Sequence, residues 1–183
     1  MKTPSKTKSR LWLVFAAGLF ALGSGLPVKA QIEVSDPDAG SIKVETIVRG
    51  LEHPWGLAFL PDGRLLVTER PGRLRIVADG QIGPEISGLP QIVARGQGGL
   101  LDVALAPDFA DTGLIYLTYS KPGPGGSGTA VRRARLVLEG SGGRLEDGAD
   151  IFEMNLFTNS GRHYGSRIVV ANDGKLFITL GDR

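Results

Sequence analysis

Short apolar runs separated by turn residues dominate the chain from Val44 to its end. Val, Ile and Leu gather in these runs, and Gly, Pro and Asp stand between them. No window of this region repeats its apolar positions with the 3.6-residue period of an amphipathic helix. Such runs predict β-strands joined by tight turns. We therefore expect an all-β fold over residues 44–183.

One unit occurs three times in this region, over residues 56–68, 99–118 and 165–179. Each copy has a glycine, an apolar run, a turn that contains Asp, a second apolar run and a threonine. Repeats of this size with several short strands are typical of a β-propeller. Runs that are apolar on both faces, such as 65–67, suit a blade packed between two neighbours. An antiparallel β-sandwich with similar hairpins is the alternative.

The length of the chain sets the number of blades. Three copies correspond to about three blades, whereas closed propellers have at least four and usually six to eight. We therefore expect the chain to be the N-terminal portion of a longer propeller. Residues 31–43 are polar and include Asp-Pro-Asp-Ala-Gly, which indicates an N-terminal arm ahead of the first blade.

Residues 1–30 have the pattern of a secretory signal peptide. An apolar run over 11–26 follows a basic start, and Val28-Lys29-Ala30 resembles a cleavage site. The start holds four basic residues and no acid: Lys2, Lys6, Lys8 and Arg10. We expect cleavage after Ala30 and a periplasmic or secreted protein with no stable membrane span. An uncleaved membrane anchor is the alternative.

Removing this leader reverses the sign of the net charge. The whole chain has a formal charge of +2, and the five leader cations account for more than all of it, so about −3 remains. That balance gives no support to a nucleic-acid surface. The chain has no cysteine and two histidines, which argues against disulfides and against a structural zinc site.

Two glycine-rich stretches invite a functional interpretation. Residues 123–128 match the dinucleotide fingerprint formally, but the alternating basic and apolar residues of 131–138 predict a strand where the fingerprint needs a helix. We therefore interpret 123–128 as a loop. In 96–102, glycines flank Gln97, whose amide both donates and accepts hydrogen bonds. The residues alone leave open whether this is a binding loop or only a tight turn.

His163 and Asp182 form the strongest candidate pair. A hairpin over 165–179 would bring both to the same end of one sheet, although they are far apart in sequence. A histidine beside a carboxylate is a common general base near neutral pH. His53 precedes Pro54 and Trp55 and is interpreted as structural, whereas for His163 both roles stay open.

At these residues the chain resembles the soluble quinoprotein sugar dehydrogenases, the glucose/sorbosone dehydrogenase family, and in particular its aldose sugar dehydrogenase branch. The resemblance rests on His53-Pro-Trp-Gly-Leu-Ala-Phe-Leu-Pro-Asp-Gly-Arg, on Gly96-Gln-Gly-Gly-Leu-Leu-Asp and on 163–183. It implies a six-bladed β-propeller that holds pyrroloquinoline quinone (PQQ) beside a calcium ion. His163-Tyr-Gly-Ser-Arg varies slightly from the family's His-x-Gly-Gly-Arg or His-x-Ser-Gly-Arg.

The resemblance also implies roles for three residues. His163 would remove the proton from the C1 hydroxyl of an aldose, Asp182 would orient that histidine, and Gln97 would bind the quinone. The expected reaction is oxidation of the aldose to its lactone by hydride transfer to PQQ, with a further electron acceptor as partner. The calcium ligands and the other quinone contacts are expected beyond residue 183, so none is assigned here.

Two other functions remain open on the sequence. The first is a non-catalytic propeller that binds a protein or a glycan, which would have no use for a histidine–aspartate pair. The second is a calcium-dependent, lactonase-like propeller hydrolase. That hydrolase would need several carboxylates around the ion, and the sequence has no obvious set.

Overall fold

The computed structural model describes residues 31–36 and 40–182. Its strands and its short helix are β1 (Gln31–Asp36), β2 (Gly40–Glu45), β3 (Pro54–Phe59), β4 (Leu65–Glu69), β5 (Arg73–Ala78), β6 (Gln81–Glu85), β7 (Leu100–Leu105), α1 (Phe109–Thr112), β8 (Leu114–Gly123), β9 (Gly126–Glu139), β10 (Gly142–Glu153), β11 (Ile168–Val170) and β12 (Leu176–Ile178). No helix in these ranges is long and apolar enough to cross a membrane.

The chain divides into two compact units, Met1–Glu45 and Thr46–Arg183. The predicted signal peptide lies outside the described residues. In the first unit, β1 and β2 pair antiparallel, with Ile32 opposite Val44 and Val34 opposite Ile42. The polar composition of 31–43 predicted an N-terminal arm, and these residues contain this hairpin. The alternation of apolar and polar positions in 31–36 and 40–45 has the period of a strand.

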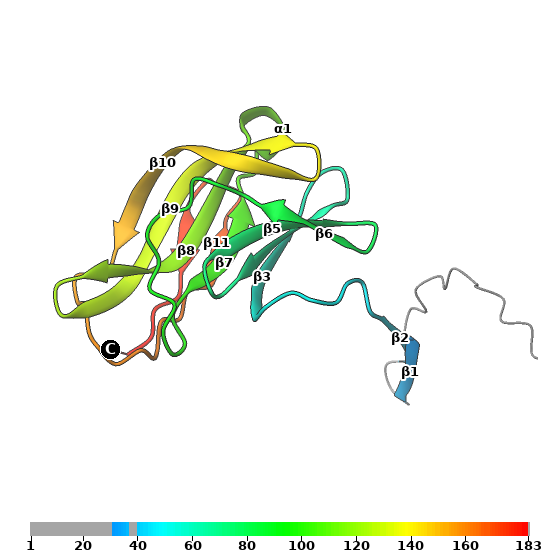
Figure 1. Cartoon of the computed structure of the whole chain (residues 1–183), viewed down its shortest axis with the longest axis horizontal. Helices are drawn as coiled ribbons and strands as arrows, with labels where there is room; N and C mark the ends of the chain where they lie inside the picture. The colour runs from blue at the N-terminus through cyan, green and yellow to red at the C-terminus, as the bar shows by residue number, and fades with distance from the viewer. Residues whose placement is uncertain (1–30, 37–39, 183) are drawn as a thin grey trace, which may run out of the picture. The chain divides into compact units, whose positions relative to one another are not determined.

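The second unit is built from consecutive antiparallel sheets, as predicted (Figure 1). Its strands are ordered β3-β4-β5-β6 in the first sheet, β7-β8-β9-β10 in the second, and β11-β12 in the third. The first two sheets are complete four-stranded blades, and the third has the first two strands of a blade. Strand β7 lies beside β3 and β4 on one side and β11 on the other, so β3, β7 and β11 are the inner strands.

Hydrogen bonds define which positions of the three repeats are equivalent. The N–H groups of Gly56, Asp102 and Arg167 donate to the hydroxyls of Thr68 on β4, Thr118 on β8 and Thr179 just after β12, at 2.8, 2.8 and 3.0 Å. The glycines that began each copy in the sequence, such as Gly99, are therefore not equivalent to Gly56. Gly56 corresponds to Asp102 and to Arg167.

The same threonines also join neighbouring blades. Thr68 donates a hydrogen bond to the carbonyl of Leu101 on β7. Thr118 donates to the carbonyl of Ser166, just before β11, at 2.8 Å. Each hydroxyl thus satisfies one backbone group of its own blade and one of the next.

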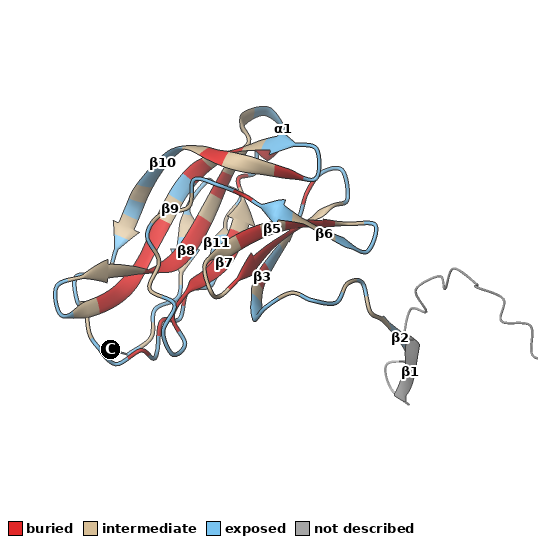
Figure 2. Cartoon of the chain, in the orientation of Figure 1, coloured by how far each residue is buried: buried red, intermediate tan, exposed pale blue. Residues whose placement is uncertain are grey.

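The apolar core lies between the first two sheets. Leu66 and Ile76 from the first sheet and Leu100, Ile115 and Leu117 from the second are almost completely buried. Figure 2 shows buried positions concentrated along β5, β7, β8 and β9. The loop before β11, which carries His163, is attached to this packed pair of blades.

The glycine-rich stretch 123–128 is the turn between β8 and β9. Gly123 pairs with Gly126 across the turn, and strands stand on both sides, so the dinucleotide motif is excluded as predicted. A side chain at Gly123 would meet the ring of Phe157, with a Cβ only 2.3 Å away. The glycines therefore allow residues 157–158 to pack closely on the turn.

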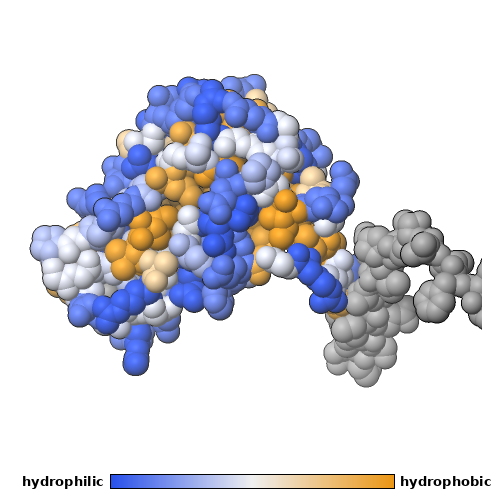
Figure 3. All heavy atoms as spheres, in the orientation of Figure 1, coloured by the Kyte–Doolittle hydropathy of each residue, from blue (hydrophilic) through white to orange (hydrophobic). Residues whose placement is uncertain are grey.

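Apolar side chains are exposed on the outer faces of the first and third sheets. Phe59 on β3 is 71% exposed and Phe177 on β12 is 61% exposed. Leu66, by contrast, is almost completely buried in the core between the first two sheets. Figure 3 shows apolar patches among polar side chains on the face in view.

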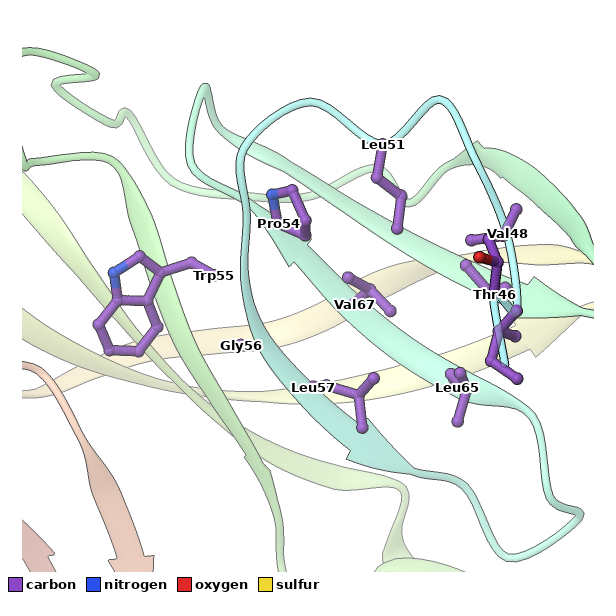
Figure 4. A pocket seen from close by; sticks show the side chains of 11 residues that line it. Thr46, Val48, Leu51, Pro54, Trp55, Gly56, Leu57, Leu65 and Val67 are labelled. Carbon is purple, nitrogen blue, oxygen red and sulfur yellow. The ribbon is translucent and has the colours of Figure 1, made fainter. Parts of the chain in front are cut away.

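The outer face of the first sheet also has a cavity of about 350 Å³. Its lining is apolar, with Val48 and Leu51 facing Leu57, Leu65 and Val67 (Figure 4). No titratable side chain lines it. The cavity therefore has the character of an uncovered packing face and offers no chemistry.

Candidate active site

His163 lies in a loop with unusual backbone geometry before β11. The φ angles of His163, Gly165 and Ser166 are 58°, 65° and 84°. Residues other than glycine rarely adopt this left-handed region, and they stay there only when surrounding contacts hold them. Strained loop residues of this kind gather at functional sites, so this loop is a candidate site.

The hairpin of β11 and β12 brings Asp182 next to His163. Ile168 pairs with Ile178, and beyond that pair His163 Nδ1 lies 2.7 Å from Asp182 Oδ1. A carboxylate only accepts hydrogen bonds, so Nδ1 carries the proton and Nε2 is left as the basic nitrogen. The side chain of His163 is 53% exposed, so this nitrogen is accessible to a substrate.

Gln97 contacts the same loop from the start of the second sheet. The side-chain oxygen of Gln97 accepts the backbone N–H of His163 at 2.9 Å. The backbone N–H of Gln97 donates to the carbonyl of Gly161 at 2.8 Å. The side-chain oxygen is thereby used, which leaves the amide N–H₂ of this exposed residue as the donor end. The structure therefore brings all three predicted site residues together.

The glycines around Gln97 are needed for close packing. A Cβ at Gly98 would lie 2.8 Å from the ring of Tyr164, and one at Gly99 would lie 1.9 Å from the carbonyl oxygen of Arg70. The guanidinium of Arg70 in turn donates to the carbonyl of Gly96. The stretch is thus a tight turn that also presents a polar side chain.

Three residues that were not predicted as site residues hold the His163 loop: Tyr164, Arg167 and Asp102. Tyr164 is buried and hydrogen-bonds Ser127 at 2.6 Å. Arg167 donates to the carboxylate of Asp102 at 3.0 Å, and Asp102 is 1% exposed. A signal for Asp102 was present, because it is the only charged residue in the apolar run 100–105.

His53 lies at the start of the first blade. It has a φ of 49°, and its carbonyl accepts the N–H of Arg70 at 3.0 Å. The contact involves only the backbone of His53, so the structural role of its side chain stays a prediction. Across the described residues, no three His, Cys, Asp or Glu side chains are grouped so that they could hold a metal ion.

Comparison with known proteins identifies the family. The profile of the Glucose / Sorbosone dehydrogenase family matches residues 51–183. The chain is 43% identical over 145 residues to aldose sugar dehydrogenase YliI of Escherichia coli, covering 78% of this chain and 38% of that protein. It is 30% identical over 149 residues to quinoprotein glucose dehydrogenase B of Acinetobacter calcoaceticus, covering 76% and 30%.

Solved structures agree with this match. The PQQ-bound aldose sugar dehydrogenase of Streptomyces coelicolor superposes with a TM-score of 0.64 at 30% identity, covering 74% of this chain and 40% of that one. The chain therefore spans well under half the length of the relatives it matches. The blade topology, the matched profile and these relatives together show that the chain belongs to the glucose/sorbosone dehydrogenase family.

Proposed function

We propose that the protein containing this chain oxidises an aldose sugar at C1 to the lactone, with PQQ as the oxidant and His163 as the general base. The observation that carries the proposal is the hydrogen bond between His163 Nδ1 and Asp182. That bond leaves an accessible basic nitrogen in a loop held by many contacts. A non-catalytic binding surface has no need of such a pair.

His163 would take the proton of the C1 hydroxyl on Nε2. Asp182 would keep the Nδ1 proton in place, fix the orientation of the ring and stabilise the imidazolium that forms. The backbone of His163 is held by Gln97 through its N–H. The base is thus oriented from both its ring and its backbone.

Gln97 is the residue of this chain that fits the quinone. Its amide N–H₂ is a donor, and the oxygens of a quinone and of its carboxylates are acceptors. Bound PQQ would supply the two-electron oxidation by accepting hydride from C1. The quinoprotein dehydrogenase of A. calcoaceticus and the PQQ-bound structure from S. coelicolor support this choice of cofactor.

Calcium has a weaker basis in these residues. The family resemblance implies the ion, but the part of the chain that the structure describes has no group of three His, Cys, Asp or Glu side chains that could hold it. No step above depends on calcium. Its ligands would have to come from backbone carbonyls or from residues outside the described ranges.

Export is proposed on the leader pattern of residues 1–30. In the periplasm the enzyme would oxidise free sugars outside the cytoplasm. The N-terminus of the protein recovered from the periplasm should be Gln31. A mature protein that begins at Met1 in the membrane fraction would contradict export by cleavage.

Reconstitution tests the proposed function. The purified apoprotein should oxidise an aldose, with reduction of an artificial dye, only after PQQ is added, and the lactone should form in proportion to the dye reduced. A panel of aldoses would then identify the preferred sugar. Absence of PQQ-dependent dye reduction with every aldose would reject the proposal.

A further inference from the structure

One position of the repeat carries three different residues that meet between the inner strands. Gly56, Asp102 and Arg167 are equivalent by their hydrogen bonds to threonine. They lie on or next to β3, β7 and β11. At this position, the first blade has no side chain, the second has a carboxylate and the third has a guanidinium.

Asp102 uses both of its oxygens to hold the segment that follows His163. Oδ1 accepts from the guanidinium of Arg167 at 3.0 Å, and Oδ2 accepts from the backbone N–H of Ile168 at 2.8 Å. The side chain of Asp102 is 1% exposed. A buried carboxylate needs such partners, because burial without them is very unfavourable.

Two residues of the first blade, Gly56 and Trp55, lie next to the contact between Asp102 and Arg167. A Cβ at Gly56 would lie 2.9 Å from Asp102 Oδ1, so any larger residue there would push the carboxylate away. The guanidinium of Arg167 lies over the ring of Trp55, 5.4 Å from its centroid. Trp55 is also among the residues that line the apolar cavity of the first sheet (Figure 4).

The strained loop gives this arrangement a consequence for His163. His163, Gly165 and Ser166 all have positive φ, and a non-glycine residue keeps such a conformation only when its surroundings hold it. Asp102 fixes the first residues after Ser166 to β7. The same strand follows directly from the loop of Gln97, so one carboxylate links the two loops of the site.

We propose that Asp102 is a positioning residue, which acts through Arg167 and the N–H of Ile168 to set the position of His163 relative to Gln97. The inference rests on the proposed function and deepens it. Asp102 touches neither sugar nor quinone in this account. Its effect on the reaction is exerted entirely through the backbone that carries the base.

The test compares Asp102→Asn with Asp150→Asn in the full-length protein. Asp150 is a matched control, because it also accepts from an arginine, Arg132, and from Tyr119, but it lies on the outer strand β10. Asp102→Asn should lower kcat about 10-fold or more, with KM for the aldose within two-fold of wild type. Asp150→Asn should lower thermal stability while kcat stays within two-fold of wild type.

A second readout does not require activity. Nitrogen-15 NMR of the apoprotein should show His163 protonated on Nδ1 in wild type and a mixture of tautomers in Asp102→Asn. Arg167→Gln keeps the carboxylate and its bond to Ile168, and should give the same change to a smaller degree. It replaces Asp102→Asn as the test variant if that variant does not fold.

Two results would overturn the inference. One is that Asp102→Asn and Arg167→Gln both keep the wild-type kcat and the wild-type tautomer of His163, while their stability falls as in Asp150→Asn. Asp102 would then be purely structural. The other is an equal loss of kcat in Asp150→Asn, which would make the effect general. If wild type oxidises no aldose, the proposed function fails, and the tautomer comparison alone still decides the role of Asp102.

Discussion

At the scale of single residues, the proposal gives the two ends of the Gln97 side-chain amide different partners, so each end can be tested separately. The oxygen accepts the N–H of His163, and the N–H₂ is the end available to the quinone. Gln97→Glu keeps an acceptor for His163 but removes the donor, so PQQ affinity should fall at least 10-fold, as expected for about 1.5–3 kcal/mol from one hydrogen bond to a charged ligand. Titration of the apoprotein with PQQ measures this.

Gln97→Ala is the matched comparison, because it removes both contacts. It should weaken PQQ binding by a similar factor and, at saturating PQQ, also lower kcat, whereas Gln97→Glu should retain more of its kcat. Wild-type PQQ affinity in Gln97→Glu would contradict the assignment of the amide to the quinone.

The residue scale also shows how far the sequence could lead. His163 and Asp182 could be paired from the sequence, because a hairpin with an Asp-Gly turn fixes which positions lie opposite each other. The hydrogen bond from the N–H of His163 to Gln97 could not be predicted, because it depends on how two loops from different blades pack. Asp102 stood out only as a charge in an apolar run, with no indication of its partner.

At the scale of strands and blades, the threonines offer a matched pair. Thr68→Val and Thr118→Val each leave a buried N–H and a buried carbonyl without their partner, which should cost about 1–3 kcal/mol of stability. Thr118 holds the carbonyl of Ser166, close to His163, so only Thr118→Val should also lower kcat several-fold. Denaturant unfolding and steady-state kinetics measure the two effects.

Thr118→Ser is the control, because it keeps the hydroxyl, and it should restore most of both properties. An equal loss of kcat in Thr68→Val and Thr118→Val would contradict a specific link from β8 to the His163 loop.

Glu69 gives the first blade a defined sensitivity to acid. Burial alone would raise its pKa, but hydrogen bonds from Arg73, the N–H of Glu52 and Arg75 outweigh burial and lower the pKa from 4.5 to about 2. Because the folded-state pKa is the lower one, the ionised carboxylate stabilises the fold fully above about pH 4.5, and this is lost as the pH falls toward 2.

Glu69→Gln should therefore lower stability at pH 7 and flatten the fall in stability between about pH 4.5 and 2. Urea unfolding at a series of pH values, with wild type alongside, would show it. An unchanged slope in this range would mean that Glu69 is not the responsible group.

The strands show which part of the fold is local. Both Asp-Gly hairpins were predictable, because the aspartate of each turn accepts the N–H of the residue two positions later. Asp62 accepts the N–H of Arg64, and Asp173 accepts the N–H of Lys175. The alignment of the repeats was not predictable, because the glycines that seemed equivalent in the sequence pack against different residues. Gly99 makes room for the backbone of Arg70, whereas Gly56 makes room for Asp102.

At the scale of the whole molecule, the exposed outer faces predict how residues 31–183 behave alone. Phe59 and Phe177, on two separate outer faces, are both largely exposed, and apolar surface of this kind drives association. The isolated chain should therefore aggregate or bind a hydrophobic dye, and should not oxidise sugar with PQQ. Thermal unfolding, light scattering and dye reduction measure these properties.

A cooperative melt with sugar oxidation by this chain would contradict that prediction. It would mean that two blades and part of a third are enough to form a working site. The three repeats in the sequence predicted about three blades, and the described residues form two four-stranded sheets and the two-stranded sheet β11-β12.

The most direct measurement of the central claim is the steady-state rate of PQQ-reconstituted full-length protein with His163→Ala. Loss of the base should lower kcat by about 10²–10⁴-fold, and Asp182→Asn should lower it less, because the imidazole remains but is held less firmly. Quinone affinity should stay close to wild type in both variants. A His163→Ala enzyme with a kcat near that of wild type would contradict the account.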